Sequence, residues 1–218
     1  MQTFTEENYL KTIYKLSDET ENVTTNQLAA LLNTKAASVT DMLKKLSEKK
    51  LIDYVPYYGV SLTSVGKKIA IDVVRRHRLW EYFLVEKLNF KWDEVHDMAE
   101  ELEHISSADL INRLDHFMGH PPYDPHGDPI PDENGMIKKS EFKPISLLAV
   151  NECGLITGVK EHSAAFLQYL EKINLVLGSH VTIVEILTYD HSVVLSVNQS
   201  ANYISISKDA AKNILITK

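Results

Sequence analysis

The stretch "VHDMAEELEHIS", residues 95–106, combines two histidines with several carboxylates on what reads as an amphipathic helix. At a helical step of about 100° per residue, four of these side chains share one face beside the apolar stripe. They are His96, Glu100, Glu103 and His104. A solvated charged face is the common alternative, but such a face usually pairs acids with basic residues, and no Lys or Arg occurs from Asp93 to Ser106. Imidazoles beside carboxylates therefore indicate ligands for a divalent cation.

Composition limits the classes of protein that such a site can serve. The chain has 218 residues, 44% of them hydrophobic, and can build one large or several small domains around real cores. No apolar run is long enough for a membrane span, and the start, "MQTFTEENYLKTIY", lacks the order of a signal peptide, so we expect a cytoplasmic protein. The single cysteine, Cys153, excludes an internal disulfide and a thiolate zinc cluster, and we expect it to be a small buried residue.

The net charge of −7 is distributed unevenly along the chain. Residues 1–78 carry +3, residues 79–144 carry −9 and residues 145–218 carry −1. Such asymmetry favours separate duties for separate segments. The overall negative sign therefore does not exclude a nucleic-acid partner for the basic amino-terminal third.

The basic third has the element order of a small DNA-binding domain. Periodic apolar residues predict three helices, over residues 5–17, 24–33 and 37–50. Thr24 or Thr25 caps the second helix. Two β-rich runs around a Pro/Gly turn follow in residues 51–63, and Thr63 or Ser64 then caps a long helix. Two short helices joined by a tight turn and followed by a two-stranded wing are typical of a winged helix-turn-helix.

The third predicted helix has the character of a recognition helix. Small and hydroxyl side chains near its start can approach base edges in the major groove, and lysines further along can contact phosphates. The residues predicted to contact DNA are Thr25, Lys35, Ala37, Ser38, Thr40, Lys44 and Tyr58. Ala36, Lys45, Lys49, Lys50 and Tyr57 have similar character. A helical hairpin packed against another protein is the alternative that helix lengths leave open.

Six segments follow one another along the chain: "EENYLKTIYKL", "SVTDMLKKLSEKKLI", "VSLTSVGKKIA", "RRHRLWEYFL", "VHDMAEELEHISS" and "DPHGDPIP". Together they resemble the diphtheria-toxin-repressor and manganese-transport-regulator (DtxR/MntR) family of metal-dependent bacterial repressors, over nearly the whole chain. The resemblance implies a mainly α fold with a small β domain. It divides the chain into a winged helix-turn-helix domain (1–72), a helical metal-binding and dimerisation domain (73–120), a Pro-rich linker (121–144) and a small FeoA-like β-barrel (145–218).

The resemblance also implies two metal sites per subunit. The ligands of the primary site fall on Asn8, Glu100, Glu103 and His104. Those of the second site fall on His77, Glu81 and His96, and in the manganese-type branch the residue at His77 belongs to the metal pair that includes the residue at Glu100. Weaker candidates are Glu161 or His162 in the barrel and Asp124 and His126 in the linker. Side chains at such linker positions are usually exposed.

Two departures from the family pattern bear on the metal. Iron-type members have a Met on the first helix and a Cys at the position of Glu100, and this chain has neither. Asn8 stands where the manganese-type branch has Asp, and Lys11 stands where that branch can have an acid. Oxygen and imidazole ligands suit harder ions, so Mn²⁺ is favoured over Fe²⁺ as the cofactor, although the neutral Asn8 weakens the site.

These features predict a transcriptional repressor of metal-ion homeostasis. One ion bound between Asn8 and the Glu100–His104 segment would fix the spacing of two recognition helices in a homodimer, and so permit binding to a palindromic double-stranded operator. A winged-helix regulator that responds to a non-metal ligand is one alternative. A metalloenzyme is another, but a di-iron bundle needs two Glu-x-x-His motifs and this chain has one, Glu101 to His104. We therefore expect no enzymatic activity.

Overall fold

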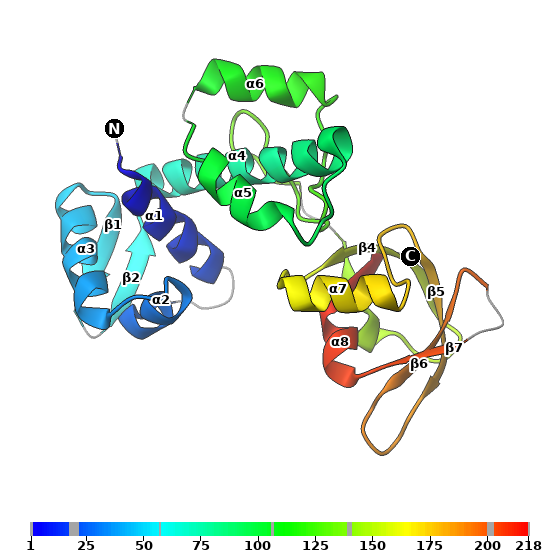
Figure 1. The fold of residues 1–218 in the computed structure, drawn as a ribbon. Helices are drawn as coiled ribbons and strands as arrows, with labels where there is room; N and C mark the ends of the chain where they lie inside the picture. Colours follow the sequence, from blue (N-terminus) through cyan, green and yellow to red (C-terminus); the bar gives the residue numbers. More distant parts are fainter. Residues whose placement is uncertain are drawn as a thin grey trace. The chain divides into compact units, whose positions relative to one another are not determined.

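The computed structural model describes residues 2–17, 22–56, 58–105, 107–138, 141–199 and 203–217 (Figure 1). The chain forms two compact units. Unit 1 comprises Met1–His77, Glu100–Leu114 and Pro131–Ile137, and unit 2 comprises Arg78–Ala99, Asp115–Ile130 and Lys138–Lys218. Each unit therefore gathers segments that are distant in sequence. In the described ranges, no helix is both long and apolar enough to cross a membrane.

Unit 1 begins with the predicted winged helix-turn-helix. Its helices are α1 (Phe4–Ser17), α2 (Thr25–Leu31) and α3 (Ala36–Glu48), and its wing is the antiparallel pair β1 (Ile52–Val55) and β2 (Gly59–Leu62). Thr24 starts α2 with a capping box, because its hydroxyl accepts from the Gln27 amide while the Gln27 side chain accepts from the Thr24 amide. Leu10, Leu28 and Leu43 are fully buried in the core that these elements share. The prediction for this region is confirmed.

Three more helices follow the wing: α4 (Ser64–Leu88), α5 (Val95–Leu102) and α6 (Ala108–Phe117). The Thr63 hydroxyl accepts from the Gly66 amide at 3.1 Å, as expected for the start of α4. The helix predicted over residues 95–106 is shorter than expected. It ends at Leu102, and the next two residues form a turn in which the Ile105 amide donates to the Leu102 carbonyl. Glu103 and His104 therefore lie just beyond the end of the helix.

Unit 2 contains the β-rich end of the chain. Its elements are β3 (Lys143–Pro144), the 3₁₀ turn η1 (Ile145–Leu147), β4 (Cys153–Val159), α7 (Ala164–Lys172), β5 (His180–Ile186), β6 (Val193–Val197), β7 (Tyr203–Ile206), α8 (Lys208–Asn213) and β8 (Ile214–Thr217). The strands form an antiparallel sheet in the order β3-β8-β4-β5-β6-β7. Cys153 is exposed at the start of β4, which contradicts the expected burial.

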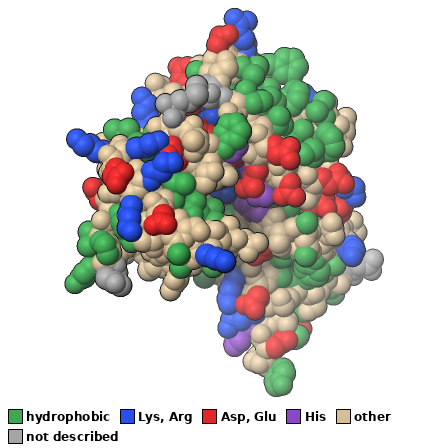
Figure 2. All heavy atoms as spheres, turned by 60° about the vertical axis from the view of Figure 1, so that its left-hand side comes forward, with side chains coloured by type: hydrophobic (Ala, Val, Ile, Leu, Met, Phe, Trp, Pro, Cys, Tyr) green, Lys and Arg blue, Asp and Glu red, His purple; other side chains and the backbone are tan. Residues whose placement is uncertain are grey.

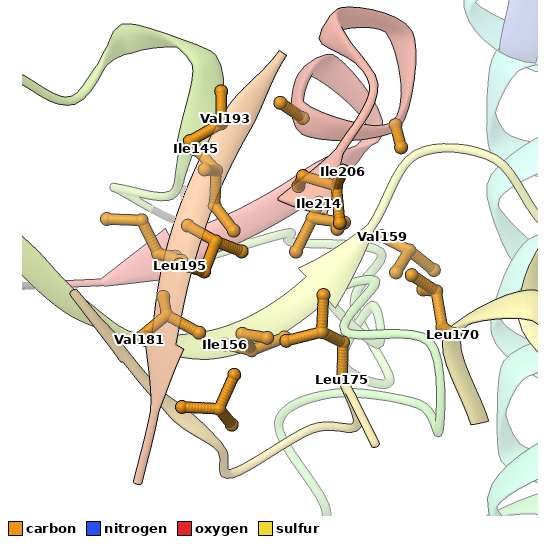
Figure 3. Packing of buried hydrophobic residues seen from close by; sticks show 14 of the residues in the cluster. Ile145, Ile156, Val159, Leu170, Leu175, Val181, Val193, Leu195, Ile206 and Ile214 are labelled. Atoms are coloured by element: carbon orange, nitrogen blue, oxygen red, sulfur yellow. The ribbon is translucent and has the colours of Figure 1, made fainter. Parts of the chain in front are cut away.

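The sheet confirms a small β domain but corrects the prediction of a closed barrel. β3 and β7 are the outer strands and do not pair with each other among the described residues. β3 is short and contains Pro144, which has no amide hydrogen to donate to a further strand. Apolar side chains from β4, β5, β6 and β8 meet on one side of the sheet, where Leu170 of α7 and Ile145 of η1 join them (Figure 3).

The segment expected as a linker includes a packed loop in unit 2. The Asp124 carboxylate accepts from the amides of His126 and Asp128 at 2.8 and 2.9 Å. The His126 carbonyl accepts from the Val159 amide at 2.9 Å, which holds the loop on β4. Asp124 and His126 are 5% and 1% exposed, so the expectation of exposed side chains at these positions is wrong.

Gly127 makes this close approach possible. Its φ is +88°, and a Cβ there would lie 2.2 Å from the Thr157 carbonyl oxygen. We expect Gly127→Ala to destabilise unit 2 by about 2–4 kcal/mol, because the clash with backbone adds to the strain of a left-handed conformation. Gly119 is the matched control, since its φ is +78° but nothing lies within 4 Å of an added Cβ. Gly119→Ala should cost about 1 kcal/mol.

Scanning calorimetry of the two variants beside the parent protein measures the difference. Equal losses of stability in Gly127→Ala and Gly119→Ala would contradict the tight seating of this loop on β4.

Candidate metal centres and DNA-binding face

Unit 1 places a buried carboxylate at the meeting point of α1, α4 and the turn after α5. Glu103 is 0% exposed. Its Oε1 lies 2.7 Å from Lys11 Nζ, and its Oε2 lies 2.7 Å from His77 Nδ1. Lys11 Nζ also contacts Glu100 Oε1 at 3.2 Å. We call the group formed by Glu7, Asn8, Lys11, His77, Glu100, Glu103 and His104 the Glu103 centre.

The charge state of Glu103 follows from these neighbours. Burial by itself raises the pKa of this carboxyl, since it disfavours the charged form. The contact with His77 and the positive charge of Lys11 outweigh burial and hold the pKa of Glu103 below its ordinary value. Glu103 is thus an ionised carboxylate inside the protein, which is the form that binds a cation.

His104 is oriented by residues of α1 and α4. Its Nδ1 lies 2.7 Å from Glu7 Oε2, and Glu7 Oε1 in turn accepts from Arg76 at 3.1 Å. The ring of Phe4 stacks on the imidazole at a centroid distance of 4.5 Å. The other ring nitrogen, Nε2, lies 3.9 Å from Glu103 Oε1. A carboxylate that holds one nitrogen of a histidine while the other faces a second carboxylate is the usual arrangement around a metal-binding histidine.

The donors of the Glu103 centre fit a divalent ion. Asn8 Oδ1 is buried and has no hydrogen-bond partner among the described residues. Asn8 shares a face of α1 with Glu7 and Lys11, whose side chains contact His104 and Glu103. A buried oxygen without a donor is costly in a protein interior, and a bound cation would satisfy it. The available donors are carboxylate and amide oxygens and imidazole nitrogens, without sulfur.

Unit 2 holds a second group around Glu81. Glu81 is buried, and its Oε1 lies 3.2 Å from His96 Nδ1 while its Oε2 lies 3.6 Å from His126 Nδ1. Ligand atoms of Glu81, Asp124 and His126 all lie within 4.8 Å of one another. We call Glu81, His96, Asp124 and His126 the Glu81 cluster. The Trp92 carbonyl lies 2.8 Å from His126 Nε2 and accepts from it, so that Nδ1 faces Glu81.

Burial and mutual charge perturb the pKa values in the Glu81 cluster. Burial, with the charges of Asp128 and Glu81, raises the pKa of Asp124 to about 7, against the opposing effect of Arg78 and His126. Burial lowers the pKa of His126, but the nearby Glu81 carboxylate and the charge of Asp124 outweigh it and raise that pKa to about 9. A metal ion bound by Asp124 and His126 would have to displace the protons that these pKa values favour.

Arg78 anchors the loop of this cluster to α4. Its guanidinium donates to the Pro129 carbonyl at 2.6 Å and to Asp128 at 2.8 Å, and it lies 3.6 Å from Asp124. The loop that carries two candidate ligands is therefore fixed on the helix that carries Glu81.

The structure divides the predicted metal ligands between the two units. Asn8, His77, Glu100, Glu103 and His104 belong to unit 1, whereas Glu81 and His96 belong to unit 2. On α4, His77 precedes Glu81 by one turn. Among the weaker candidates, the His162 ring stacks on His126 at 4.8 Å, while Glu161 is exposed and accepts from the Ser163 amide near the start of α7.

Sequence reasoning missed three partners of these groups: Glu7, Arg76 and Trp92. The spacing of Glu7, Asn8 and Lys11 on one helical face is a signal for Glu7. Arg76 and Trp92 act through tertiary contacts, for which the sequence gives no local signal.

The predicted DNA-binding residues lie on α2, α3 and the wing. Thr24, Thr25, Asn26, Thr40, Lys44, Tyr54, Pro56 and Gly59 line a hollow of about 610 Å³. Lys35, Ala37, Ser38, Lys44 and Tyr58 are exposed, Thr25 and Thr40 are half-buried, and Tyr57 lies outside the described residues. Basic side chains at the surface are interspersed with acidic ones (Figure 2). Small polar groups and single lysines can therefore approach DNA without a continuous basic patch.

Lys49 is paired with a buried carboxylate of α1. Its Nζ lies 2.8 Å from the fully buried Glu6, and Lys45 Nζ lies 3.7 Å from the same carboxylate. Burial raises the pKa of Glu6, but Lys49, the Thr3 amide and Lys45 together hold it below its usual value. These two lysines link α3 to α1, whereas the exposed Lys44 lies 3.7 Å from the exposed Asp41 and is better placed for a phosphate.

Three family models match successive segments of the chain. The family model described as iron dependent repressor, N-terminal DNA binding domain, matches residues 1–60. The model described as iron dependent repressor, metal binding and dimerisation domain, matches residues 63–132. A FeoA domain model matches residues 143–218.

Individual relatives of this chain are named as repressors or transcriptional regulators. The iron-dependent repressor IdeR of Mycobacterium tuberculosis is 34% identical over 127 residues, which are 58% of this chain and 55% of IdeR. The match thus spans about half the length of that relative. The HTH-type transcriptional regulator MntR of Oceanobacillus iheyensis is 36% identical over 114 residues, which are 52% of this chain and 77% of MntR.

A solved structure described as a manganese-dependent transcriptional repressor complex with manganese is similar over 97% of this chain and 98% of its own, with 30% identity and a TM-score of 0.87. The winged helix, the helices that carry the candidate His and Glu ligands and the FeoA-like sheet therefore occur together in a known protein. This chain belongs to the diphtheria-toxin-repressor and manganese-transport-regulator (DtxR/MntR) family of metal-dependent repressors.

Proposed function

We propose that this protein is a metal-dependent transcriptional regulator that represses genes of metal-ion homeostasis, with the ion as co-repressor. The observation that carries this proposal is the unpartnered, buried Asn8 oxygen on α1, on the same helical face as the side chains that reach Glu103 and His104. Asn8, Glu100, Glu103 and His104 would hold the ion, with His77 beside Glu103. The oxygen and nitrogen atoms of these side chains would act as ligands of a bound divalent ion.

In this proposal, the Glu103 centre links metal binding to the position of the recognition helix α3. α1 contributes Glu7, Asn8 and Lys11 to the centre, and it contacts α3 through Glu6 and Lys49. Ordering of the centre would therefore restrict α1 and, through it, the recognition helix α3. In a homodimer, this restriction selects the spacing of two recognition helices, and a palindromic operator is the matching double-stranded DNA partner.

The remaining assignments follow from this mechanism. DNA binding belongs to residues 1–72, metal binding and dimerisation to residues 73–120, the connection to residues 121–144 and the FeoA-like part to residues 145–218. The ligand set without sulfur favours Mn²⁺ over Fe²⁺. A regulator of this kind acts on chromosomal DNA in the cytoplasm and needs no catalytic step.

We further propose that Glu81 holds a second ion. Two sets of partners are available to it. His77, one turn earlier on α4, and His96 form the first set, and the buried Asp124 and His126 form the second. The burial of Asp124 and His126 and the fixed orientation of the His126 ring support the second set.

Glu103→Gln tests the switch. We expect it to remove metal-stimulated operator binding, or to raise the Mn²⁺ concentration required by at least about tenfold, because it removes a charged ligand. Glu101→Gln is the control, since Glu101 is an exposed carboxylate two residues away. The measurement is fluorescence anisotropy with a fragment of the protein's own promoter at fixed salt, with chelator and then with Mn²⁺, anaerobic Fe²⁺ and Zn²⁺ titrated separately. Equal binding with chelator and with every metal would contradict the proposal.

Metal stoichiometry tests the second ion. Calorimetric titration with Mn²⁺ should show two ions per subunit in the parent and one in Glu81→Gln. His126→Gln and His96→Gln then separate the two sets of partners, because the set in use loses the second ion when its histidine is replaced. His180→Gln, which changes an exposed histidine of β5, serves as the control. A stoichiometry of two in Glu81→Gln would rule out Glu81 as a ligand.

The salt dependence of operator binding tests the DNA face. Lys44→Gln should weaken binding to all sequences and reduce the slope of log K against log salt by about 1 per subunit, because one phosphate contact is lost. Lys172→Gln on α7 removes another exposed charge far along the chain and should leave the slope unchanged. An unchanged slope in Lys44→Gln would exclude this lysine from the interface.

A further inference from the structure

Lys11 is a buried cation among residues that the proposed function assigns to metal. It is 4% exposed. Its Nζ lies 2.7 and 2.9 Å from the two oxygens of Glu103 and 3.2 Å from Glu100 Oε1. The ammonium thus bridges the two carboxylates that carry the negative charge of the proposed ligand set, because Asn8 is neutral.

The positive charge of Lys11 reduces the net negative charge of the proposed ligand set. Glu100 and Glu103 together contribute two negative charges, and Lys11 cancels one of them. A divalent ion that reached Glu103 would meet an ammonium already on the same carboxylate, and like charges repel strongly in a site with little water. A divalent ion can therefore bind Glu103 only if it binds despite the repulsion from Lys11, or if the Lys11 side chain moves away.

The surroundings of Lys11 offer a place for such a movement. The side chain of Glu100 is 47% exposed, whereas that of Glu103 is fully buried. The lysine stem is long and flexible, so its ammonium can leave Glu103 and stay paired with Glu100 at the edge of the site. The backbone of Lys11 remains in α1, one turn after Glu7, and the displaced ammonium is therefore tethered close to the centre.

We propose that Lys11 is a tethered cation that competes with the divalent ion for Glu103 and so sets the metal concentration at which the Glu103 centre fills. This inference rests on the proposed metal-binding function. It assigns Lys11 two effects: it neutralises the buried carboxylates of the metal-free protein, and it weakens metal binding at the same position. A lysine with a purely structural role would contribute the first effect without the second.

Lys11→Met tests the inference, because methionine fills similar space without charge. Calorimetric titration of the metal-depleted full chain with Mn²⁺ gives the affinities, and the affinity class that Glu103→Gln removes marks the Glu103 centre. We expect Lys11→Met to bind Mn²⁺ at this centre at least about tenfold more tightly than the parent, as a lost like-charge repulsion implies. Its melting temperature without metal should fall, because Glu103 then lacks a partner cation, and saturation with Mn²⁺ should restore most of the loss.

Lys11→Arg and Lys11→Gln complete the experiment. Lys11→Arg keeps the charge and should retain the weak affinity of the parent. Lys11→Gln keeps a hydrogen-bond donor without the charge, and it should tighten binding even if Lys11→Met does not fold. Unchanged or weaker Mn²⁺ affinity in a folded uncharged variant would overturn the inference while leaving the proposed function intact.

A different result marks failure of the proposed function itself. If neither the parent nor any uncharged Lys11 variant has an Mn²⁺ affinity class that depends on Glu103, the centre binds no metal and both ideas fail. If the parent lacks such a class and Lys11→Met gains it, the competition by Lys11 is supported directly.

Discussion

The buried charge of Glu103 is the constraint around which unit 1 is organised. An ionised carboxylate inside a protein costs several kcal/mol unless cations or donors surround it. Glu103 is fully buried and obtains its partners from two helices, Lys11 of α1 and His77 of α4. Because the carboxylate follows directly after α5, its compensation ties three elements together. Any change in the charge around Glu103 is therefore a change in the forces that hold α1 in place.

This constraint also explains how α4 can relate two candidate centres. The helix carries His77 at the Glu103 centre and Glu81, one turn later, in the Glu81 cluster. His77 contacts Glu103 within unit 1, and Glu81 contacts His96 within unit 2. Both candidate centres therefore depend on side chains that one helix carries. Arg78, between them, holds the loop that carries Asp124 and His126 of the Glu81 cluster.

Local patterns predicted the helices and caps of the winged helix and the start of α4, but not the tertiary partners of the candidate ligands. The winged helix was predictable because the period of its apolar residues, its capping residues and its turn residues all indicate the same helices and strands. The Thr24 capping box is one example. The end of α5 was not, because the sequence continues with helix-compatible residues while Glu103 turns towards Lys11 and His77. The burial of His126 was hidden for a similar reason, since a Pro-rich segment gives no local sign that Gly127 will seat it on β4. Whether the sheet closes into a barrel likewise depends on pairing between strands distant in sequence, which local patterns do not reveal.

Asn8 and Lys11, the two residues of α1 that depart from the family pattern, both reduce the negative charge of the Glu103 centre. Asn8 provides a neutral oxygen where a carboxylate would attract a cation more strongly, and Lys11 places a positive charge on the remaining carboxylates. Both choices reduce the negative charge available to an ion without removing the oxygen and nitrogen donors. A sensor must release its ion when the free concentration falls, so an affinity below the maximum is a requirement of the switch. In the proposed switch, the donor geometry of the Glu103 centre would decide which ions fit, and its reduced charge would decide the ion concentration at which the centre fills.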